Sequence, residues 1–162
     1  MRRRYELGFK DESHARTVLK LLIDQYSTST ASPRYGPYVL AIEHRADRAL
    51  IGHIGLSPID DDVEIGFAIA QHYQRQGLAM EAIIAVSHWA LATFALDRIL
   101  GITSAANVAA KRTLESSQFA YQGDCDMTFQ GARQSVSRYV LFACSGRLAS
   151  SVQTIPGSDT EV

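Results

Sequence analysis

Cysteine and an excess of either charge are scarce in this sequence. Its 162 residues include two cysteines, Cys125 and Cys144, whose spacing indicates no disulfide framework, so we expect reduced thiols in a cytoplasmic protein. The 16 basic and 17 acidic residues give a net charge of −1, which argues against a large nucleic-acid-binding surface. The five histidines have no metal-ligand spacing, and we therefore predict no metal site.

Signals for secretion and for membrane insertion are also missing. No apolar segment follows the N-terminal arginines, so no signal peptide is expected. The longest apolar stretch, Leu78 to Leu96, contains Glu81 and His88, which favours a buried central helix over a membrane helix. The length suits one domain, which we place at residues 1–145, and we expect a disordered, Ser/Thr/Gly-rich tail at 146–162.

Hydrophobic periodicity predicts a helix, three strands, and then alternating helices and strands. The predicted elements are a helix (Asp11–Tyr26), strands (Tyr38–Glu43, Ala49–Leu56, Val63–Ala70), a long helix (Gly77–Phe94), a strand (Arg98–Thr103), a helix (Val108–Ser116) and a hairpin (Phe119–Phe129 with Ser137–Cys144). The long helix is apolar nearly all round and should be covered on most sides, with Trp89 in the core. This order predicts an α+β (mixed α/β) fold with a sheet flanked by helices.

The segment from Val63 to Ala79 carries the strongest functional signal. An apolar strand ends at Ala70, and a polar turn then leads through Gln74-x-x-Gly77-x-Ala79 into the long helix. The unpaired N–H groups and the dipole at the start of a helix form an anion site, usually for phosphate. Gly77 has no Cβ and lets the backbone approach that anion closely. The spacing matches neither a Walker loop nor the dinucleotide-binding fingerprint.

This loop resembles the pyrophosphate loop of the Gcn5-related N-acetyltransferase (GNAT) family, Gln/Arg-x-x-Gly-x-Gly/Ala. The stretch Gln-Gly-Leu-Ala-Met-Glu-Ala at 76–82 is similar to the branch that includes the ribosomal-protein N-terminal acetyltransferases. Residues 107–119 resemble that family's Asn-x-x-Ser-x-x-x-Leu-Glu-Lys-x-Gly-Phe segment. The resemblance covers about Tyr38 to Tyr121. It implies the GNAT fold, acetyl-CoA as co-substrate, and acetyl transfer to a primary amine, either a peptide N-terminus or a small amine.

The resemblance also implies cofactor contacts from three segments. Backbone N–H groups of the loop would bind the pyrophosphate, the end of the preceding strand would pair through its backbone with the pantetheine arm, and Asn107 would bond the same arm. The residues concerned are Gln74, Arg75, Gln76, Gly77, Leu78 and Ala79 in the loop, and Phe67, Ala68 and Ile69 in the strand. Asn107 is also a good helix N-cap, and both roles can hold together. Arg75 stands where the family often has Gly, and it either contacts a phosphate or faces solvent.

Glu64 is the candidate general base. It lies ten residues before Gln74, close to where some family members carry a general-base Glu, and partial burial would raise its pKa toward neutrality. The alternatives are an ion pair with a neighbouring Lys or Arg and a role in anchoring a water molecule. No general acid is assigned, because the positions where relatives often carry Tyr or Ser hold Leu114 and Ala110, leaving Tyr121 as a weak substitute.

The N-terminal part predicts a departure from the family pattern. We expect the chain to lack the family's first strand–helix unit, since Arg4 to Phe9 suffices for only a short strand. Tyr38–Glu43 would then be a sheet edge open to pairing, and we expect a two-fold homodimer. The missing unit normally helps to wall the acceptor site, so a catalytically weak acyl-CoA-binding or sensing module is the alternative function.

Overall fold

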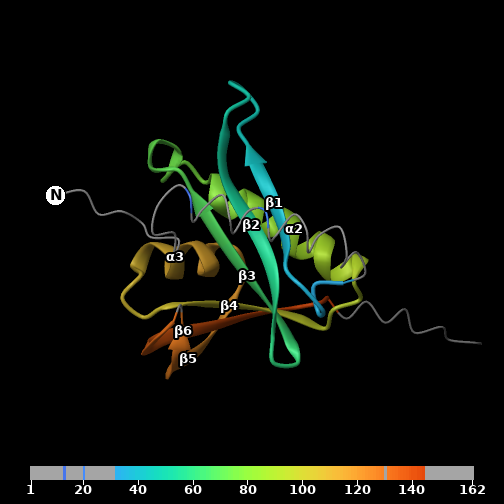
Figure 1. The fold of residues 1–162 in the computed structure, drawn as a ribbon, viewed down its shortest axis with the longest axis vertical. Helices are drawn as coiled ribbons and strands as arrows, with labels where there is room; N and C mark the ends of the chain where they lie inside the picture. Colours follow the sequence, from blue (N-terminus) through green and yellow to red (C-terminus); the bar gives the residue numbers. More distant parts are fainter. Residues whose placement is uncertain (1–12, 14–19, 21–31, 130, 145–162) are drawn as a thin grey trace, which may run out of the picture.

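The computed structural model describes residues 13, 20, 32–129 and 131–144. Its centre is a six-stranded sheet with the order β1-β2-β3-β4-β6-β5, in which β3 and β4 are parallel and the other neighbours antiparallel (Figure 1). The elements are β1 (Tyr38–Glu43), β2 (Leu50–Ile59), β3 (Asp62–Ile69), the 3-10 turn η1 (Gln71–Tyr73), α2 (Leu78–Thr93), β4 (Arg98–Ser104), α3 (Val108–Ser116), β5 (Ala120–Phe129) and β6 (Ala132–Phe142). This order confirms the predicted mixed α/β fold.

Several predicted features fall outside the described residues. These are the short strand Arg4–Phe9, the tail 146–162 and most of the helix Asp11–Tyr26. Within that helix Ser13 and Lys20 are described, and both are helical.

Two hairpin turns of the sheet are tighter than the sequence predicts. The predicted strands, which end at Leu56 and begin again at Val63, leave too long a turn, because β2 continues through Pro58, which pairs with Val63. Proline is tolerated here because the neighbouring strand β1 ends its pairing at Leu56, so no ladder donor is lost. The second hairpin differs in the same way, since the strand predicted to begin at Ser137 begins at Ala132. That end of the hairpin is largely exposed and lacks the alternation that marks a half-buried strand.

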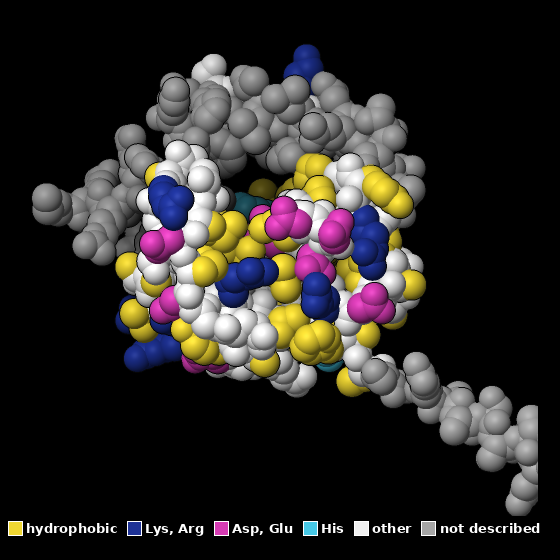
Figure 2. All heavy atoms as spheres, turned by 90° about the horizontal axis from the view of Figure 1, so that it is seen from below, with side chains coloured by type: hydrophobic (Ala, Val, Ile, Leu, Met, Phe, Trp, Pro, Cys, Tyr) yellow, Lys and Arg dark blue, Asp and Glu magenta, His cyan; other side chains and the backbone are white. Residues whose placement is uncertain are grey.

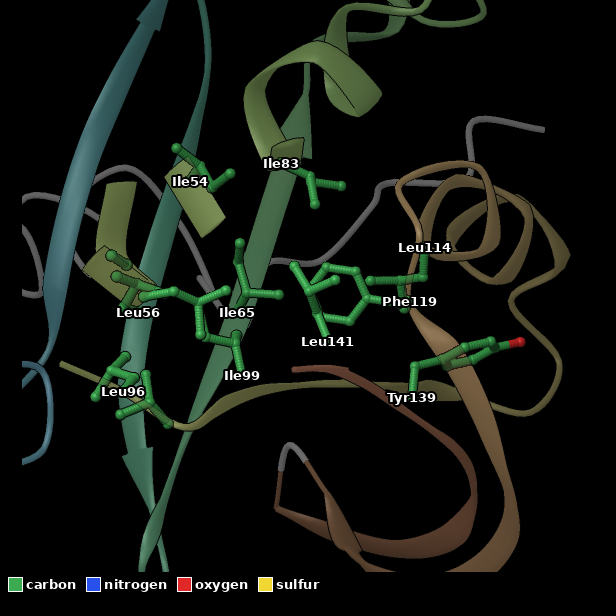
Figure 3. Packing of buried hydrophobic residues seen from close by; sticks show 13 residues of the cluster. Ile54, Leu56, Ile65, Ile83, Leu96, Ile99, Leu114, Phe119, Tyr139 and Leu141 are labelled. Atoms are coloured by element: carbon green, nitrogen blue, oxygen red, sulfur yellow. The ribbon is translucent and has the colours of Figure 1, made fainter. Parts of the chain in front are cut away.

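The main core lies between the sheet and helices α2 and α3 (Figure 3). Ile54 and Ile65 from the sheet meet Ile83 of α2 and Leu114 of α3 in one buried cluster. Tyr139 of β6 is fully buried, and its hydroxyl donates to Glu115 of α3 at 2.9 Å. Burial and this hydrogen bond raise the pKa of Tyr139 to about 12, so it stays a neutral donor that ties α3 to the sheet.

Helix α2 is buried on one face only, which corrects the expectation that it is covered on most sides. Ile83, Ser87, Ala90 and Leu91 are its buried residues. Trp89 is 38% exposed rather than part of the core, although its ring contacts Tyr38 and Phe94 at centroid distances of 5.5 and 5.2 Å. The exposed residues of α2 are Met80, Glu81, Ala85, His88, Trp89, Ala92 and Thr93, so apolar and polar residues share the outer face. Among the described residues no helix is long and apolar enough to cross a membrane.

A second, smaller apolar cluster lies on the opposite face of the sheet. It consists of Leu100, Ile102, Val136 and Val140, with Ile59, Met127 and Phe129 packed against it. Successive side chains of a strand point to opposite faces, so Glu64 and Gly66 of β3 share this face while Ile65 faces the helices.

The surface seen from below has acidic and basic side chains interspersed with hydrophobic ones (Figure 2).

Candidate active site

The two parallel strands of the sheet pair over a short length and then separate. β3 and β4 are in register only at Glu64 with Leu100 and at Ile65 with Gly101, and Figure 1 shows them diverging beyond that point. On its other side β3 stays paired with β2 as far as Ile69. From Gly66 to Ile69 the backbone edge that faces β4 therefore has no strand partner among the described residues. This free edge contains the three residues, 67–69, for which the family resemblance implies a contact with the pantetheine arm.

The loop that follows β3 presents a row of unpaired N–H groups. The chain passes through η1, and Gly77 then forms the N-cap of α2 with φ 80°, a left-handed conformation that favours glycine. Within the described part of the chain, the N–H groups of residues 75–80 donate to no backbone carbonyl, and the first helical bond runs from the N–H of Glu81 to the carbonyl of Gly77. Of the loop residues assigned from the sequence, 75–79 thus form one continuous donor surface suited to an anion, whereas the N–H of Gln74 is already bonded.

Two glutamine side chains hold this loop in place. Gln74 donates from Nε2 to the carbonyl of Ile69 at 2.8 Å, and Gln76 donates from Nε2 to the carbonyl of His72 at 3.1 Å. Both side chains thus bond to backbone carbonyls of this connection. The structure therefore gives the side chain of Gln74 a positioning role, and its backbone N–H already donates to the carbonyl of Gln71 at 3.3 Å.

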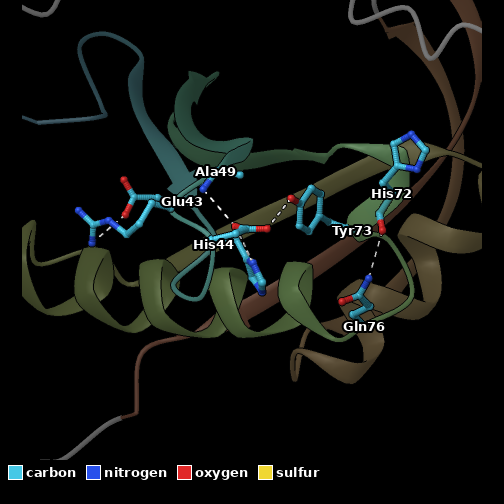
Figure 4. A network of polar contacts seen from close by, with 8 residues as sticks. Glu43, His44, Ala49, His72, Tyr73 and Gln76 are labelled. Carbon is cyan, nitrogen blue, oxygen red and sulfur yellow. Dashed lines mark hydrogen bonds and ion pairs between the residues drawn. The ribbon is translucent and has the colours of Figure 1, made fainter.

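A polar network fixes the start of the loop to the turn between β1 and β2 (Figure 4). The Asp47 carboxylate accepts hydrogen bonds from the Tyr73 hydroxyl at 2.8 Å and from the Ala49 N–H at 3.1 Å, and it lies 2.9 Å from Nδ1 of His44. The bonds from Tyr73, His44 and Ala49, in that order of size, lower the pKa of Asp47 to about 2. The sequence does not reveal this network, because 26 residues separate Asp47 from Tyr73; Asp47 in a turn is its only signal.

Glu64 lies at the point where the two parallel strands separate. Its carboxylate is half-buried, and desolvation raises its pKa. Among the described residues it has no hydrogen bond and no ion pair, so the alternative of a structural pair with Lys or Arg is not observed. It also lines a cavity of about 340 Å³. A desolvated, unpaired carboxylate in a cavity has the properties of a general base.

Asn107 forms the N-cap of α3, as its alternative role predicts. Its Oδ1 accepts a hydrogen bond from the N–H of Ala110 at 3.1 Å. The helix begins soon after β4, at the end of the strand that diverges from β3. Asn107 therefore stands beyond the carboxyl end of one strand, as the loop before α2 stands beyond the other.

Two further candidates differ in which face of the sheet they occupy. His53 pairs with Ala68 and shares the face of Glu64, and burial lowers its pKa. Tyr121 pairs with Tyr139, whose ring it contacts at 5.4 Å, and so lies on the face that α3 covers. This position is opposite to that of Glu64. The register thus weakens the case for Tyr121 as the general acid.

The family model of the acetyltransferase (GNAT) domain matches residues 2–120. Because this match covers most of the chain, the chain belongs to that family and is an acetyl-CoA-dependent N-acetyltransferase. No curated protein matches it.

Solved structures of acetyltransferases share the fold. A candidate ribosomal-protein-serine acetyltransferase from Vibrio cholerae has a TM-score of 0.72 at 15% identity, over 86% of this chain and 82% of that one. A chimera of the Vibrio cholerae spermidine N-acetyltransferase SpeG and hSSAT has a TM-score of 0.65 at 22% identity, over 87% and 84%. The microcin C7 self-immunity acetyltransferase MccE, solved with acetyl-CoA and AMP, has a TM-score of 0.69 at 14% identity, over 83% and 73%.

Proposed function

We propose that this chain acetylates a primary amine, on a small molecule or at a peptide N-terminus, by direct attack of the amine on acetyl-CoA. The observation that carries the proposal is the row of free N–H groups from residues 75–80, beside a strand edge without a partner among the described residues. The loop from Gln74 to Ala79 binds the pyrophosphate. The edge formed by Phe67, Ala68 and Ile69 pairs with the pantetheine arm, which directs the thioester to the point where β3 and β4 separate.

Asn107 contributes through the part of its side chain that does not cap α3. Its Oδ1 already accepts the bond from Ala110, so a contact with the pantetheine arm falls to the Nδ2 group, which donates. The same residue then fixes the start of α3 and one amide of the cofactor.

Glu64 acts in this proposal as the base that takes a proton from the incoming ammonium, directly or through water. Burial raises the pKa of Glu64. A carboxylate with a higher pKa is a stronger base, and it therefore takes a proton from an ammonium group more readily at neutral pH. The amine lone pair then forms a bond to the thioester carbonyl carbon, and the C–S bond breaks to release the thiolate of CoA. The thiolate takes up a proton from solvent, since a thiol pKa lies not far above neutrality.

We also propose a cytoplasmic homodimer. In the described sheet β1 is an edge strand, paired on one side with β2. An open edge favours pairing with a second copy. Cys125 and Cys144 are both exposed and unpaired, which suits a reducing compartment. Light scattering at micromolar concentrations tests the dimer, and a mass near 17.8 kDa at every concentration would exclude it.

Thermal unfolding with and without nucleotides tests the cofactor site. CoA or acetyl-CoA at about 100 times its dissociation constant should stabilise the fold by about 2.7 kcal/mol, whereas ATP and NAD at the same concentration should stabilise it less. Release of CoA thiol in the presence of acetyl-CoA and a panel of amines and N-terminal peptides then tests transfer. A melting temperature that millimolar CoA does not change would refute the site.

A further inference from the structure

The cavity beside Glu64 has a size and a composition that restrict the acceptor. Besides Glu64 it is lined by residues of β2, β3, β4 and β5, namely Ile59, Ile65, Gly66, Ile102, Met127, Thr128 and Phe129. Its volume of about 340 Å³ is near the lower end of the range for small-molecule sites. A cavity of roughly 150 Å³ already holds benzene. There is therefore room for one aromatic ring with a short chain.

Most of the apolar side chains that line the cavity belong to the second core cluster, and Glu64 and Thr128 add a polar part to its surface. Ile102 is a buried member of that cluster, and Ile59, Met127 and Phe129 pack against it. The apolar part of an acceptor would thus displace water from apolar side chains that are already packed in the fold. Burial of such a body is favourable roughly in proportion to its apolar area.

Glu64 is the only ionisable residue among the described residues that line the cavity. The next acid along the same face, Asp62, is already bonded to Arg98 through both carboxylate oxygens, at 2.7 and 2.8 Å. One ammonium group can therefore meet a free carboxylate in this cavity, and a second ammonium cannot. Burying a second charge without a partner is costly.

Gly66 leaves open the space that a side chain would fill. A Cβ built on Gly66 has no heavy atom within 4 Å, in contrast to Gly101, where a Cβ would approach a side-chain carbon of Leu114 to 2.7 Å. Packing against the other described residues therefore does not require a glycine at position 66. What its missing side chain provides is volume in the cavity, next to Glu64.

We propose, building on the proposed function above, that the acceptor is a primary amine with one positive charge, carried on an uncharged apolar group about the size of an aromatic ring. The space left by the missing side chain of Gly66 admits that group, and the apolar wall of Ile102, Met127 and Phe129 selects it. A polyamine is a poor acceptor for this chain.

Steady-state kinetics with three amines test the charge and size of the acceptor. The probes are phenethylamine, propylamine and spermidine, each at saturating acetyl-CoA. We expect kcat/KM for phenethylamine to exceed those for propylamine and spermidine by about ten-fold or more, because apolar contacts and unpaired charges discriminate at that level. A higher kcat/KM for spermidine overturns the proposal and leaves the acetyltransferase function intact. No transfer to any of the three by a protein that binds CoA also overturns it, whereas a protein that fails to bind CoA refutes the proposed function itself.

The variant Gly66→Val tests whether the space at Gly66 admits the acceptor, with Ala41→Val as its control. Ala41 is an exposed residue on the same face of the sheet, two strands away, so its variant adds apolar bulk outside the cavity. For Gly66→Val we expect the apparent affinity for phenethylamine, measured as KM, to weaken by about ten-fold, with smaller changes for propylamine and for the dissociation constant of CoA. The control should change none of these. Equal increases for both amines, or a loss of CoA binding in a folded Gly66→Val protein, would show that Gly66 does not limit the acceptor.

Discussion

Replacing Glu64 by Gln should make the protein more stable and less active at the same time. The carboxylate is half-buried, has no partner among the described residues, and has a raised pKa. Gln has nearly the same shape without the charge. The variant therefore removes the cost of keeping a charge in a poorly hydrated position.

The sign of the pH dependence follows from the direction of the pKa shift. Between the pKa of Glu64 in the unfolded chain and its raised value in the fold, the folded state holds a proton that the unfolded state has lost. The free energy of unfolding therefore falls as the pH rises through this window, and above the folded pKa the loss is complete. Wild type and Glu64→Gln should be equally stable at a pH below the window. They should differ above it, with the variant more stable.

The magnitude is set by the size of the shift. Each unit by which the fold raises the pKa corresponds to about 1.4 kcal/mol at a pH above both values, and the remaining solvent contact of Glu64 reduces this figure. Each kcal/mol changes the melting temperature by about 2–4 °C in a domain of this size. Turnover should fall by about 10² to 10⁴ if Glu64 is the base.

Thermal unfolding of the cofactor-free protein from acid to neutral pH, together with the pH profile of kcat/KM, measures both effects. Glu43→Gln is a matched control, because Glu43 is an exposed residue of β1 that pairs with Arg48 on the surface. Its variant should change stability by less than about 0.5 kcal/mol. A Glu64→Gln protein that is less stable than wild type at pH 7 would show that Glu64 makes a stabilising contact. Unchanged turnover at every pH would remove Glu64 from the mechanism.

Three further variants probe the loop and the core. Gly77→Asp should weaken CoA binding by about ten-fold or more relative to Gly77→Asn, because both residues tolerate a positive φ and only Asp places a negative charge against the pyrophosphate. Calorimetric titration measures the difference, and equal affinities would exclude an anion at this position. Tyr73→Phe removes the bond to Asp47 and should raise the KM for acetyl-CoA by about three-fold with kcat unchanged, since it loosens the loop without touching the chemistry; a change in kcat alone would contradict this. Ser87→Ala should raise the free energy of unfolding by about 1 kcal/mol in denaturant titration, since the Ser87 Oγ is fully buried without a hydrogen-bond partner among the described residues; a loss of stability would reveal a partner.

The loop could be predicted from the sequence because its requirements are local. The free N–H groups follow from the start of a helix, and Gly77 follows from the close approach of the backbone to an anion, which favours a residue without a Cβ. The N-cap role of Asn107 is local in the same sense. Such features depend on neighbours within a few residues, and a motif therefore carries them.

The parts that could not be predicted depend on contacts between distant segments. The length over which β3 and β4 pair is fixed by the packing of helices and strands, and no spacing in the sequence encodes it. The same holds for the bond from Tyr73 to Asp47 and for the bidentate pair of Arg98 with Asp62, 36 residues apart. The core position predicted for Trp89 is wrong because helical periodicity identifies apolar residues but not which of them a second element covers.

The side chain of Arg75 either contacts a phosphate of the cofactor or faces solvent, and a variant can distinguish the two. It is an exposed non-glycine residue with φ 61°, a conformation that costs about 1–2 kcal/mol for an ordinary residue. Arg75→Gly removes this strain but adds conformational entropy to the unfolded chain, about 0.5–1 kcal/mol, so stability should stay the same or rise slightly. Any loss of cofactor affinity then reports the charge rather than the backbone.

We expect Arg75→Gly to weaken CoA binding by about two- to five-fold at low ionic strength, as is typical of an exposed charge pair. The difference should shrink as salt is added, because the contact is screened. Titration of CoA into both proteins at two salt concentrations measures this. Identical affinities at low salt would mean that Arg75 faces solvent, and the N–H groups of the loop would then bind the pyrophosphate without help from a side-chain charge. A loss that persists at high salt would instead mean that the backbone of the loop had changed, since screening removes a charge effect and leaves a conformational one.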